Sequence, residues 1–252
     1  MSDFDRNVAA RGTFAERTVA IDAGLRAYML SVYNYMALAV GLTGVVAWFT
    51  FQAAVVTDSA GAITGLTAFG QAIFSGPAMI ILLLATLGLV FFISFRIEKL
   101  QFSTALTLFM IYAALLGVTL SSVLLVYTGA SIARVFFISA ASFGALSLWG
   151  YTTQRDLSGM GTFLMMGLFG IIIASLVNIF LKSSGLDWMI SIIGVGVFAG
   201  LTAYDTQRIK EMYSGNDDSN TLGRKAVMGA LSLYLDFINL FMMLLRLVGD
   251  RR

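Results

Sequence analysis

Two aspartates, Asp205 and Asp236, interrupt long apolar stretches near the end of the chain. An ionisable side chain at the centre of a membrane-spanning helix costs roughly 2.5–3.5 kcal/mol on insertion scales, so such residues usually have a function. Two carboxylates in a low dielectric share a proton, bind a cation or pair with a positive side chain. A hard cation such as Ca²⁺ takes several oxygen ligands, carboxylates first. We therefore predict an ion or proton site at Asp205 and Asp236, with Asn239 as a supporting polar group and Arg96 as the positive partner.

Helix geometry predicts that the two carboxyl groups lie at similar depth. Asp236 follows Lys225 by 11 residues, which is about 16 Å of helix. Asp205 precedes Tyr213 by eight residues, or about 12 Å if the helix extends that far. Both distances are measured from the same side of the membrane, and consecutive helices in a bundle are commonly neighbours.

A purely structural interpretation of the same residues stays open. Asp236 would then be a protonated or capping carboxyl that bonds a neighbouring helix, and Asp205 would pair with Arg208 three residues later. Arg96 alone is typical of a basic residue that anchors a helix end at the cytoplasmic face.

Composition restricts the class of protein that holds these residues. The 252 residues are 58% hydrophobic and 12% charged, whereas soluble domains have roughly 25% charged residues. The chain has no Cys and no His, which removes thiolate chemistry, the commonest catalytic base and the usual sensor of near-neutral pH. The net charge of +2 indicates no nucleic-acid partner. We expect membrane lipid as the surroundings and no bound cofactor, and Ca²⁺ as an ion that the two carboxylates could bind.

Seven stretches are apolar enough to cross a bilayer as helices of about 20 residues. The fold class predicted is therefore all-α, a polytopic membrane protein with a polar segment at residues 1–26 and a seven-helix domain at residues 27–252. The helices are expected at Tyr28–Phe51, from Pro77 to Phe95 after a loop, Gln101–Tyr127, Val135–Gln154, Leu157–Leu181, from Trp188 to Tyr204 or on to Tyr213, and Ala226–Leu245.

The distribution of Lys and Arg predicts a cytoplasmic N-terminus. If the loops alternate across the membrane, eleven of the 16 basic residues fall on the side of the N-terminus and five on the other, and cytoplasmic loops carry the excess of basic residues. The basic C-terminus, Arg251 and Arg252, fits the outer side poorly, so we expect the last helix to be short, re-entrant or unusually placed.

Two segments echo each other 53 residues apart. Tyr151-Thr152-Thr153-Gln154-Arg155 resembles Tyr204-Asp205-Thr206-Gln207-Arg208. The echo suggests a duplicated helix pair, as in many transporters, or shared chemistry at helix ends, where Tyr and Arg favour the membrane interface.

The same segments carry a resemblance to a known family. Gly200–Lys210 (GLTAYDTQRIK) resembles the signature of the Bax inhibitor-1 family, and Ala230–Phe241 (ALSLYLDFINLF) looks like its last helix. Leu125–Thr128 and Gly150–Thr153 are also similar to family segments. The resemblance runs from about the first helix to the C-terminus.

The resemblance implies seven helices with the last one central, and a di-aspartyl site at Asp205 and Asp236. It implies a pH-sensitive calcium leak gated by protonation of that pair, with Arg96 matching by position an Arg that interacts with it. The tail-free ends suggest a prokaryotic inner membrane member. Bacterial relatives are also linked to restraint of a membrane-bound AAA protease, and cell-death suppression belongs to eukaryotic members.

Three functional hypotheses follow. The first is the calcium leak channel, the second a regulatory protein that restrains a membrane protease with the aspartates structural, and the third a proton-coupled carrier. An enzyme is not expected, because Ser-His and Cys-His sets are impossible and the Gly-x-Gly-Asp context of intramembrane aspartyl proteases is missing around Asp236.

Overall fold

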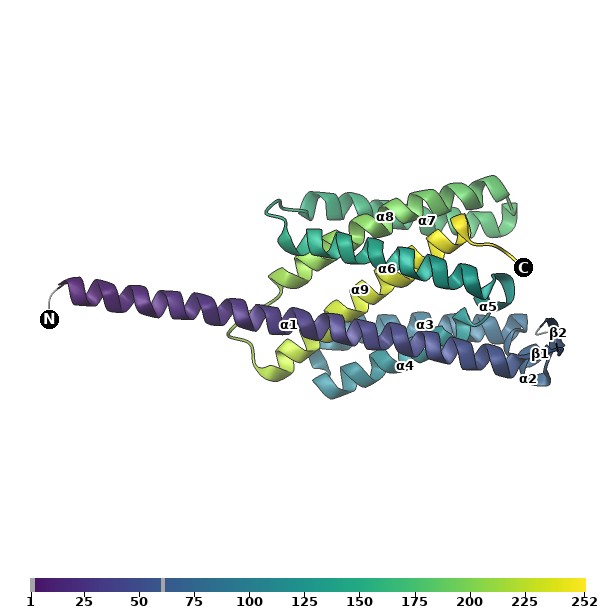
Figure 1. Cartoon of the computed structure of the whole chain (residues 1–252), viewed down its shortest axis with the longest axis horizontal. Coiled ribbons are helices and arrows are strands. Elements are labelled where there is room, and N and C mark those ends of the chain that lie inside the picture. Colours follow the sequence, from purple (N-terminus) through teal and green to yellow (C-terminus); the bar gives the residue numbers. More distant parts are fainter. Residues whose placement is uncertain (1–2, 60–61) are drawn as a thin grey trace.

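A computed structural model describes residues 3–59 and 62–252, with side chains from Ala23 onward in the first helix. Helices dominate this part of the chain (Figure 1). The elements in chain order are α1 (Asp3–Ala54), β1 (Val55–Thr57), β2 (Ile63–Leu66), α2 (Ala68–Ile73), α3 (Gly76–Arg96), a 3-10 turn (Ile97–Lys99), α4 (Phe102–Leu120), α5 (Val123–Val126), α6 (Gly129–Thr152), α7 (Ser158–Leu181), α8 (Ser184–Glu211) and α9 (Ser219–Val248).

Seven helical stretches of the described chain are long and apolar enough to cross a membrane. They comprise α1 from Ala23, α3 with its turn, α4 with α5, and α6 to α9. This confirms the predicted all-α, polytopic fold with seven spans. The predicted division at residue 26 is not marked by any break in α1, which is continuous from Asp3, and the side chains before Ala23 lie outside the described residues.

The last helix occupies the middle of the bundle, as the family resemblance implied. Helices α1, α3 and α4 form one group, α6, α7 and α8 form the other, and α9 crosses obliquely between them (Figure 1). α9 packs against α1, α4, α6 and most extensively α8. In its apolar window 67% of the residues are buried, against 11% for α3 and for α7.

Several helices begin at residues other than those predicted, because a capping side chain sets their first residue. The Ser75 hydroxyl accepts from the Ala78 amide (3.4 Å), so α3 begins at Gly76, next to the predicted Pro77. Thr128 caps α6, which therefore begins at Gly129 rather than Val135. Capping side chains at Ser183 and Asp218 likewise start α8 and α9 earlier than the apolar pattern indicated.

Two connections also differ from prediction. The segment after α1 was expected to be a loop, but its described residues form the antiparallel hairpin β1–β2 and the short helix α2. The third span is broken at Ser121 and Ser122, whose hydroxyls donate to the carbonyls of Val118 (2.6 Å) and Thr119 (2.8 Å). These bonds close α4 before α5 begins.

The last helix is neither short nor re-entrant; of the three alternatives expected for it, only the unusual placement agrees with its oblique course through the bundle. α9 has 30 residues, and the two chain ends lie at opposite ends of the bundle (Figure 1). The basic tail is held beside the start of α6: the Arg252 amide donates to the Val126 carbonyl (2.9 Å) and the Thr128 amide to the Asp250 carbonyl (3.1 Å). Arg134 pairs with Asp250 at 2.8 Å, which offsets part of the positive charge there.

Candidate functional site

The structure brings Asp205 of α8 and Asp236 of α9 together. Their carboxyl groups are close enough to hydrogen-bond to each other. Because a carboxylate only accepts hydrogen bonds, such a bond requires one proton on the pair. The two groups differ in surroundings: Asp236 is 5% exposed and Asp205 is half-buried. The two carboxyl groups therefore lie close together on neighbouring helices at the bundle centre.

One oxygen of Asp236 has no hydrogen-bond partner among the described residues, its Oδ2. Buried polar atoms in folded proteins are normally paired, so an unpaired carboxyl oxygen needs a reason. Asp236 lies on the continuous helix α9, 12 residues before its end at Val248, which keeps it deep in the apolar layer. A passing cation or a proton would satisfy this oxygen.

Asn239 lies one turn after Asp236 and is half-buried. Its Nδ2 donates to the carbonyl of Leu235 on the same helix (2.8 Å). The nitrogen therefore stabilises α9 itself, and the carbonyl oxygen of the side chain is the only part of Asn239 that remains for an ion.

Arg96 is exposed at the end of α3 and belongs to none of the three ion pairs of the described side chains. Its interaction with the aspartates therefore stays a prediction. The charge that acts on Asp205 is that of Arg208, three residues later on α8.

The residues that follow Asp205 anchor α8 to α6. Thr206 donates to the Thr202 carbonyl (2.7 Å), so the Ser147 hydroxyl, 2.9 Å away, donates to Thr206. The Tyr33 hydroxyl of α1 lies 2.7 Å from Ser147. This chain of three hydroxyls links α1, α6 and α8 one residue away from Asp205.

Gln207 and Lys210 of α8 hydrogen-bond to the end of α6 and to the loop between α6 and α7. Gln207 accepts from the Leu157 amide and donates to the Arg155 carbonyl, each at 2.8 Å. Lys210 donates to the Tyr151 carbonyl (2.9 Å). The two segments that echo each other in sequence thus contact each other in the fold, while the duplication of a helix pair stays a prediction.

A second polar contact holds α9 two residues before Asp236. Tyr234 is fully buried, and its hydroxyl lies 2.7 Å from Thr43 on α1. Thr43 in turn donates to the carbonyl of Ala113 on α4 (2.9 Å). Phe109 and Tyr112 meet the Tyr234 ring edge-on, at centroid distances of 5.5 and 5.9 Å. These contacts fix the rotation of α9 and hence the direction of Asp236.

Sequence analysis missed the members of these networks on α1 and α6. Thr43, Tyr33 and Ser147 are small or amphipathic residues in apolar helices, with no local signal that separates them from other helix residues. The one available signal for these networks was the run Tyr204-Asp205-Thr206-Gln207, in which four successive side chains near a helix end carry polar groups.

The family comparison covers the part of the chain that contains the two aspartates. The family model described as "Inhibitor of apoptosis-promoting Bax1" matches residues 25–252, which include all seven spans and both aspartates. The chain belongs to the Bax inhibitor-1 family. The family predicted from the two aspartate segments is therefore confirmed.

Three relatives of this chain come from bacteria. The chain is 49% identical over 232 residues to the inner membrane protein YbhL of Escherichia coli, covering 91% of this chain and 94% of YbhL. It is 51% identical over 246 residues to a protein of Rickettsia prowazekii, covering 95% and 96% of the two chains. A protein of Caulobacter vibrioides is 42% identical over 254 residues, with both chains fully covered. Together with the seven spans, these similarities support a multi-pass inner membrane location for this family member.

The described residues limit how this family member could hold a metal. No group of three or more Asp, Glu, His or Cys side chains gathers among them in an arrangement that would bind an ion. Ca²⁺ prefers six to eight oxygen ligands, which is more than the two carboxyl groups supply.

Proposed function

We propose that the protein is a pH-sensitive calcium leak pathway of the inner membrane, gated by the proton shared between Asp205 and Asp236. The observation that supports this proposal most directly is the contact between two carboxyl groups from neighbouring helices, one of them with an unpaired oxygen in the bundle centre. Functional ionisable groups in membranes face bundle interiors or ion pathways in this way.

The shared proton provides the switch. With the proton present, a hydrogen bond ties α8 to α9. Without it, two like charges face each other where the dielectric is low, and the repulsion favours separation of the helices or entry of a cation between them. Arg208 moderates the charge on Asp205 alone, because it lies on the same helix. The gate therefore responds to proton concentration and to divalent cations together.

The N-terminus is proposed to be cytoplasmic, from the excess of basic residues at that end of the bundle. The half-buried pair Lys225–Asp217 (2.6 Å) lies at the same end, in and after the α8–α9 connection. Lys225 also donates to the Met212 carbonyl (2.9 Å). In this proposal the α8–α9 loop covers the path from the cytoplasm to Asp205 and Asp236.

The test is Ca²⁺ flux into proteoliposomes from pH 5 to pH 8. We expect pH-dependent flux for the wild type and a flattened pH profile for Asp205→Asn and for Asp236→Asn, since each removes one half of the proton-sharing pair. Arg208→Gln should shift the profile, because it removes the charge that acts on Asp205. Asp187→Asn is the matched control, as Asp187 lies on the same helix α8 but in its first turn.

Equal thermal stability of all variants in detergent shows that the comparison concerns gating and not folding. A folded wild type that passes no Ca²⁺ at any pH, or variants whose profiles match Asp187→Asn, would refute the gate.

A further inference from the structure

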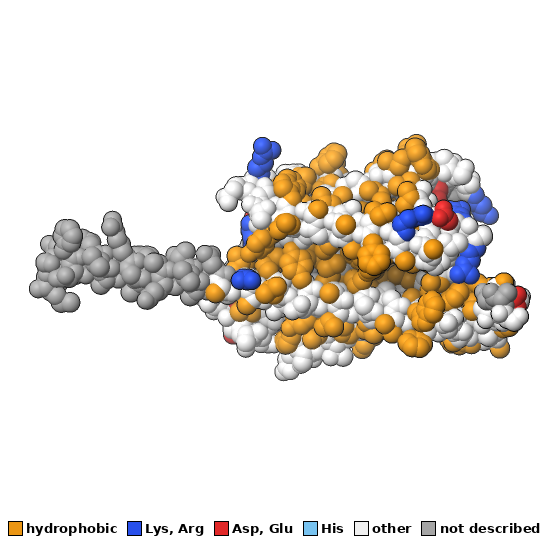
Figure 2. Space-filling view, viewed as in Figure 1, with side chains coloured by type: hydrophobic (Ala, Val, Ile, Leu, Met, Phe, Trp, Pro, Cys, Tyr) orange, Lys and Arg blue, Asp and Glu red, His pale blue; other side chains and the backbone are white. Residues whose placement is uncertain are grey.

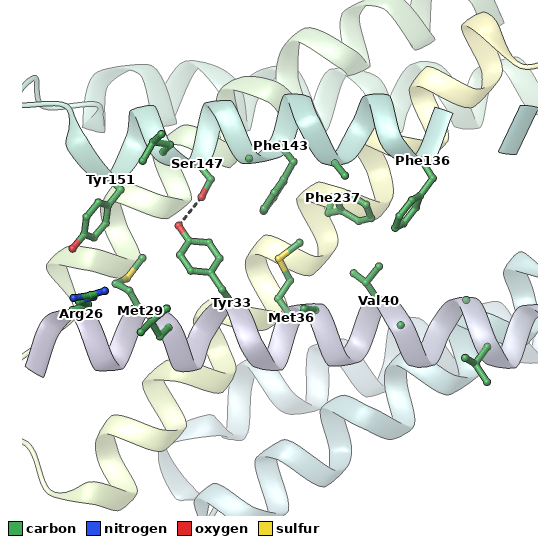
Figure 3. Close-up of a pocket in the computed structure, with 18 residues that line it drawn as sticks. Arg26, Met29, Tyr33, Met36, Val40, Phe136, Phe143, Ser147, Tyr151 and Phe237 are labelled. Atoms are coloured by element: carbon green, nitrogen blue, oxygen red, sulfur yellow. Dashed lines mark hydrogen bonds between the residues drawn. The ribbon is translucent and has the colours of Figure 1, made fainter. Parts of the chain in front are cut away.

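A long open groove runs along the lipid-facing side of the bundle between α1 and α6. It has a volume of about 1220 Å³, and its walls extend from Arg26 to Val45 on α1 and from Phe136 to Tyr151 on α6. Phe237 of α9 forms part of its floor (Figure 3). Figure 2 shows the corresponding strip of recessed hydrophobic side chains on this face. We call this feature the lateral groove.

The walls of the lateral groove are almost entirely apolar and leave backbone accessible. A side-chain carbon added at Gly41, Gly44 or Gly144 would meet nothing within 4 Å. The hydroxyls of Tyr33 and Ser147 point toward each other across the groove (Figure 3), and their bond to each other satisfies them. Because the groove interior has no unpaired polar group, it suits a slender apolar occupant.

The two ends of the lateral groove differ in charge. Arg26 and Tyr151 lie at one end, and Val40 and Phe136 toward the other (Figure 3). Arg26 is exposed and belongs to none of the ion pairs of the described side chains. Lys210 lies behind Tyr151, with its Nζ 5.7 Å from the ring centre, but that Nζ donates to the Tyr151 carbonyl (2.9 Å), so Arg26 is the charge that faces the groove.

The length of the groove matches the bilayer. Val45 follows Arg26 by 19 residues, which is about 28 Å of helix, close to the roughly 30 Å of the hydrocarbon core. Arg26 thus lies at the boundary between apolar layer and headgroups, and the rest of the groove lies within the acyl chains.

We propose that the lateral groove binds an anionic phospholipid, with an acyl chain along its floor and the phosphate at Arg26. A molecule with one long apolar part and one anionic end complements a groove that is apolar along its length and positive at one end. A transmembrane helix could use the small residues Gly41 and Gly144 for close approach, but it would leave the charge of Arg26 unmatched. The proposal does not depend on the gate.

Selectivity in this site must come from the headgroup. The groove and the lipid tails are equally apolar, so transfer of a chain between them gains mainly packing. Each basic residue near the headgroups attracts anionic lipid by an amount that corresponds to about fivefold in affinity. Arg26 should therefore produce a preference for anionic over zwitterionic lipid of that order.

Native mass spectrometry of the purified full chain tests this inference with two lipids of identical chains. The probes are palmitoyl-oleoyl-phosphatidylglycerol and palmitoyl-oleoyl-phosphatidylcholine. The wild type should retain one phosphatidylglycerol molecule with about fivefold preference. Arg26→Gln should remove the preference, whereas Lys99→Gln, a basic residue in the turn after α3, should keep it.

Filling the groove gives the second arm. Gly144→Leu should abolish retention of the lipid, because the new side chain occupies the open space. Gly88→Leu is the matched control, since Gly88 on α3 is equally open and lies outside the groove. Equal binding of both lipids by the wild type, or unchanged retention in Gly144→Leu, would overturn the proposal. So would a lipid-free dimer that Gly144→Leu disrupts, which would make the groove an interface between two copies.

Discussion

The central helix α9 and the outer helix α3 are both long enough to span the membrane, but their surroundings are opposite. In α9, 67% of the residues of the spanning window are buried in protein, against 11% in α3, which is the more apolar of the two. α9 carries Asp236, Tyr234 and Asn239 in its interior, whereas the charge of α3, Arg96, lies in its last turn.

This difference inverts the rule of soluble proteins, in which the most apolar segments are the most buried. Lipid solvates apolar side chains as well as protein does, so a helix gains burial where its polar groups need protein partners. The site of this protein therefore lies on the less apolar helices, α8 and α9. Four predictions test the contrast, beginning with the largest effect.

The first prediction compares equal truncations on the two helices. Leu240 of α9 is 1% exposed and Leu84 of α3 is 62% exposed. Leu240→Ala should lower the free energy of unfolding by about 2–5 kcal/mol, because it leaves a cavity between helices. Leu84→Ala should cost less than about 0.5 kcal/mol, because lipid fills the space. Unfolding by SDS in mixed micelles measures both, and similar losses would contradict the contrast.

The second prediction is a change of sign between two Gly→Ala substitutions. A side-chain carbon at Gly150 of α6 would overlap the backbone carbonyl of Ala203 on α8, whereas Gly88 of α3 is open. Gly150→Ala should therefore destabilise by about 1–3 kcal/mol, as an overpacked core does. Gly88→Ala should stabilise by about 0.5–1 kcal/mol through helix propensity.

The same unfolding assay reports the sign of each change. Loss of stability in both variants would show that α3 packs against protein more closely than the structure indicates. Gain in both would show that α6 and α8 separate easily.

The third prediction contrasts two ion pairs at opposite ends of the bundle. Lys225–Asp217 has side chains 29% and 20% exposed, and Arg134–Asp250 has side chains 56% and 66% exposed. A double-mutant cycle with Lys225→Met and Asp217→Asn should give a coupling of about 1 kcal/mol. The cycle for Arg134 and Asp250 should give less than about half of that, because water and salt screen it. Equal coupling energies for the two pairs would contradict the idea that burial strengthens the Lys225–Asp217 pair.

The fourth and smallest effect concerns the caps that start the two helices. Hydrogen bonds from Thr221, and then Asn220, hold the pKa of Asp218 at the start of α9 below its ordinary value of 3.8. The cap of α3 is the hydroxyl of Ser75, which does not titrate. Asp218→Ala and Ser75→Ala should both lower the melting temperature slightly at pH 7.

The pH dependence separates the two caps. A carboxyl whose pKa is lowered by folding contributes stability that is complete above 3.8 and is lost as pH falls through the lowered value. The difference between wild type and Asp218→Ala should therefore shrink below about pH 4, while that of Ser75→Ala stays constant. Asp218→Asn keeps an acceptor without the titration, so its melting temperature should be the less pH-dependent. A constant Asp218→Ala difference down to pH 2 would contradict this cap.

Hydropathy and helical rise predicted much of the helix pattern. The depth of Asp236 followed from a fixed rise per residue, and α9 is indeed continuous around it. The end of α8 at Glu211 falls between the two ends predicted, Tyr204 and Tyr213, because helix ends depend on caps and not on apolarity.

Errors concentrated where the partner of a residue is distant in sequence. The basic C-terminus led to three alternatives for the last helix, short, re-entrant or unusually placed, because the sequence does not show that Asp250 pairs with Arg134, 116 residues earlier.

The sequence by itself determined that the chain crosses the membrane as seven helices, and that two carboxyl groups lie on its last two spans, because hydropathy and helical rise are local properties. Only the tertiary structure decided that these carboxyl groups meet and that a groove opens between α1 and α6. Tyr33 and Ser147, 114 residues apart, meet there because whole helix faces fit together. That fit depends on the shape of every side chain along both helices, which no local pattern contains.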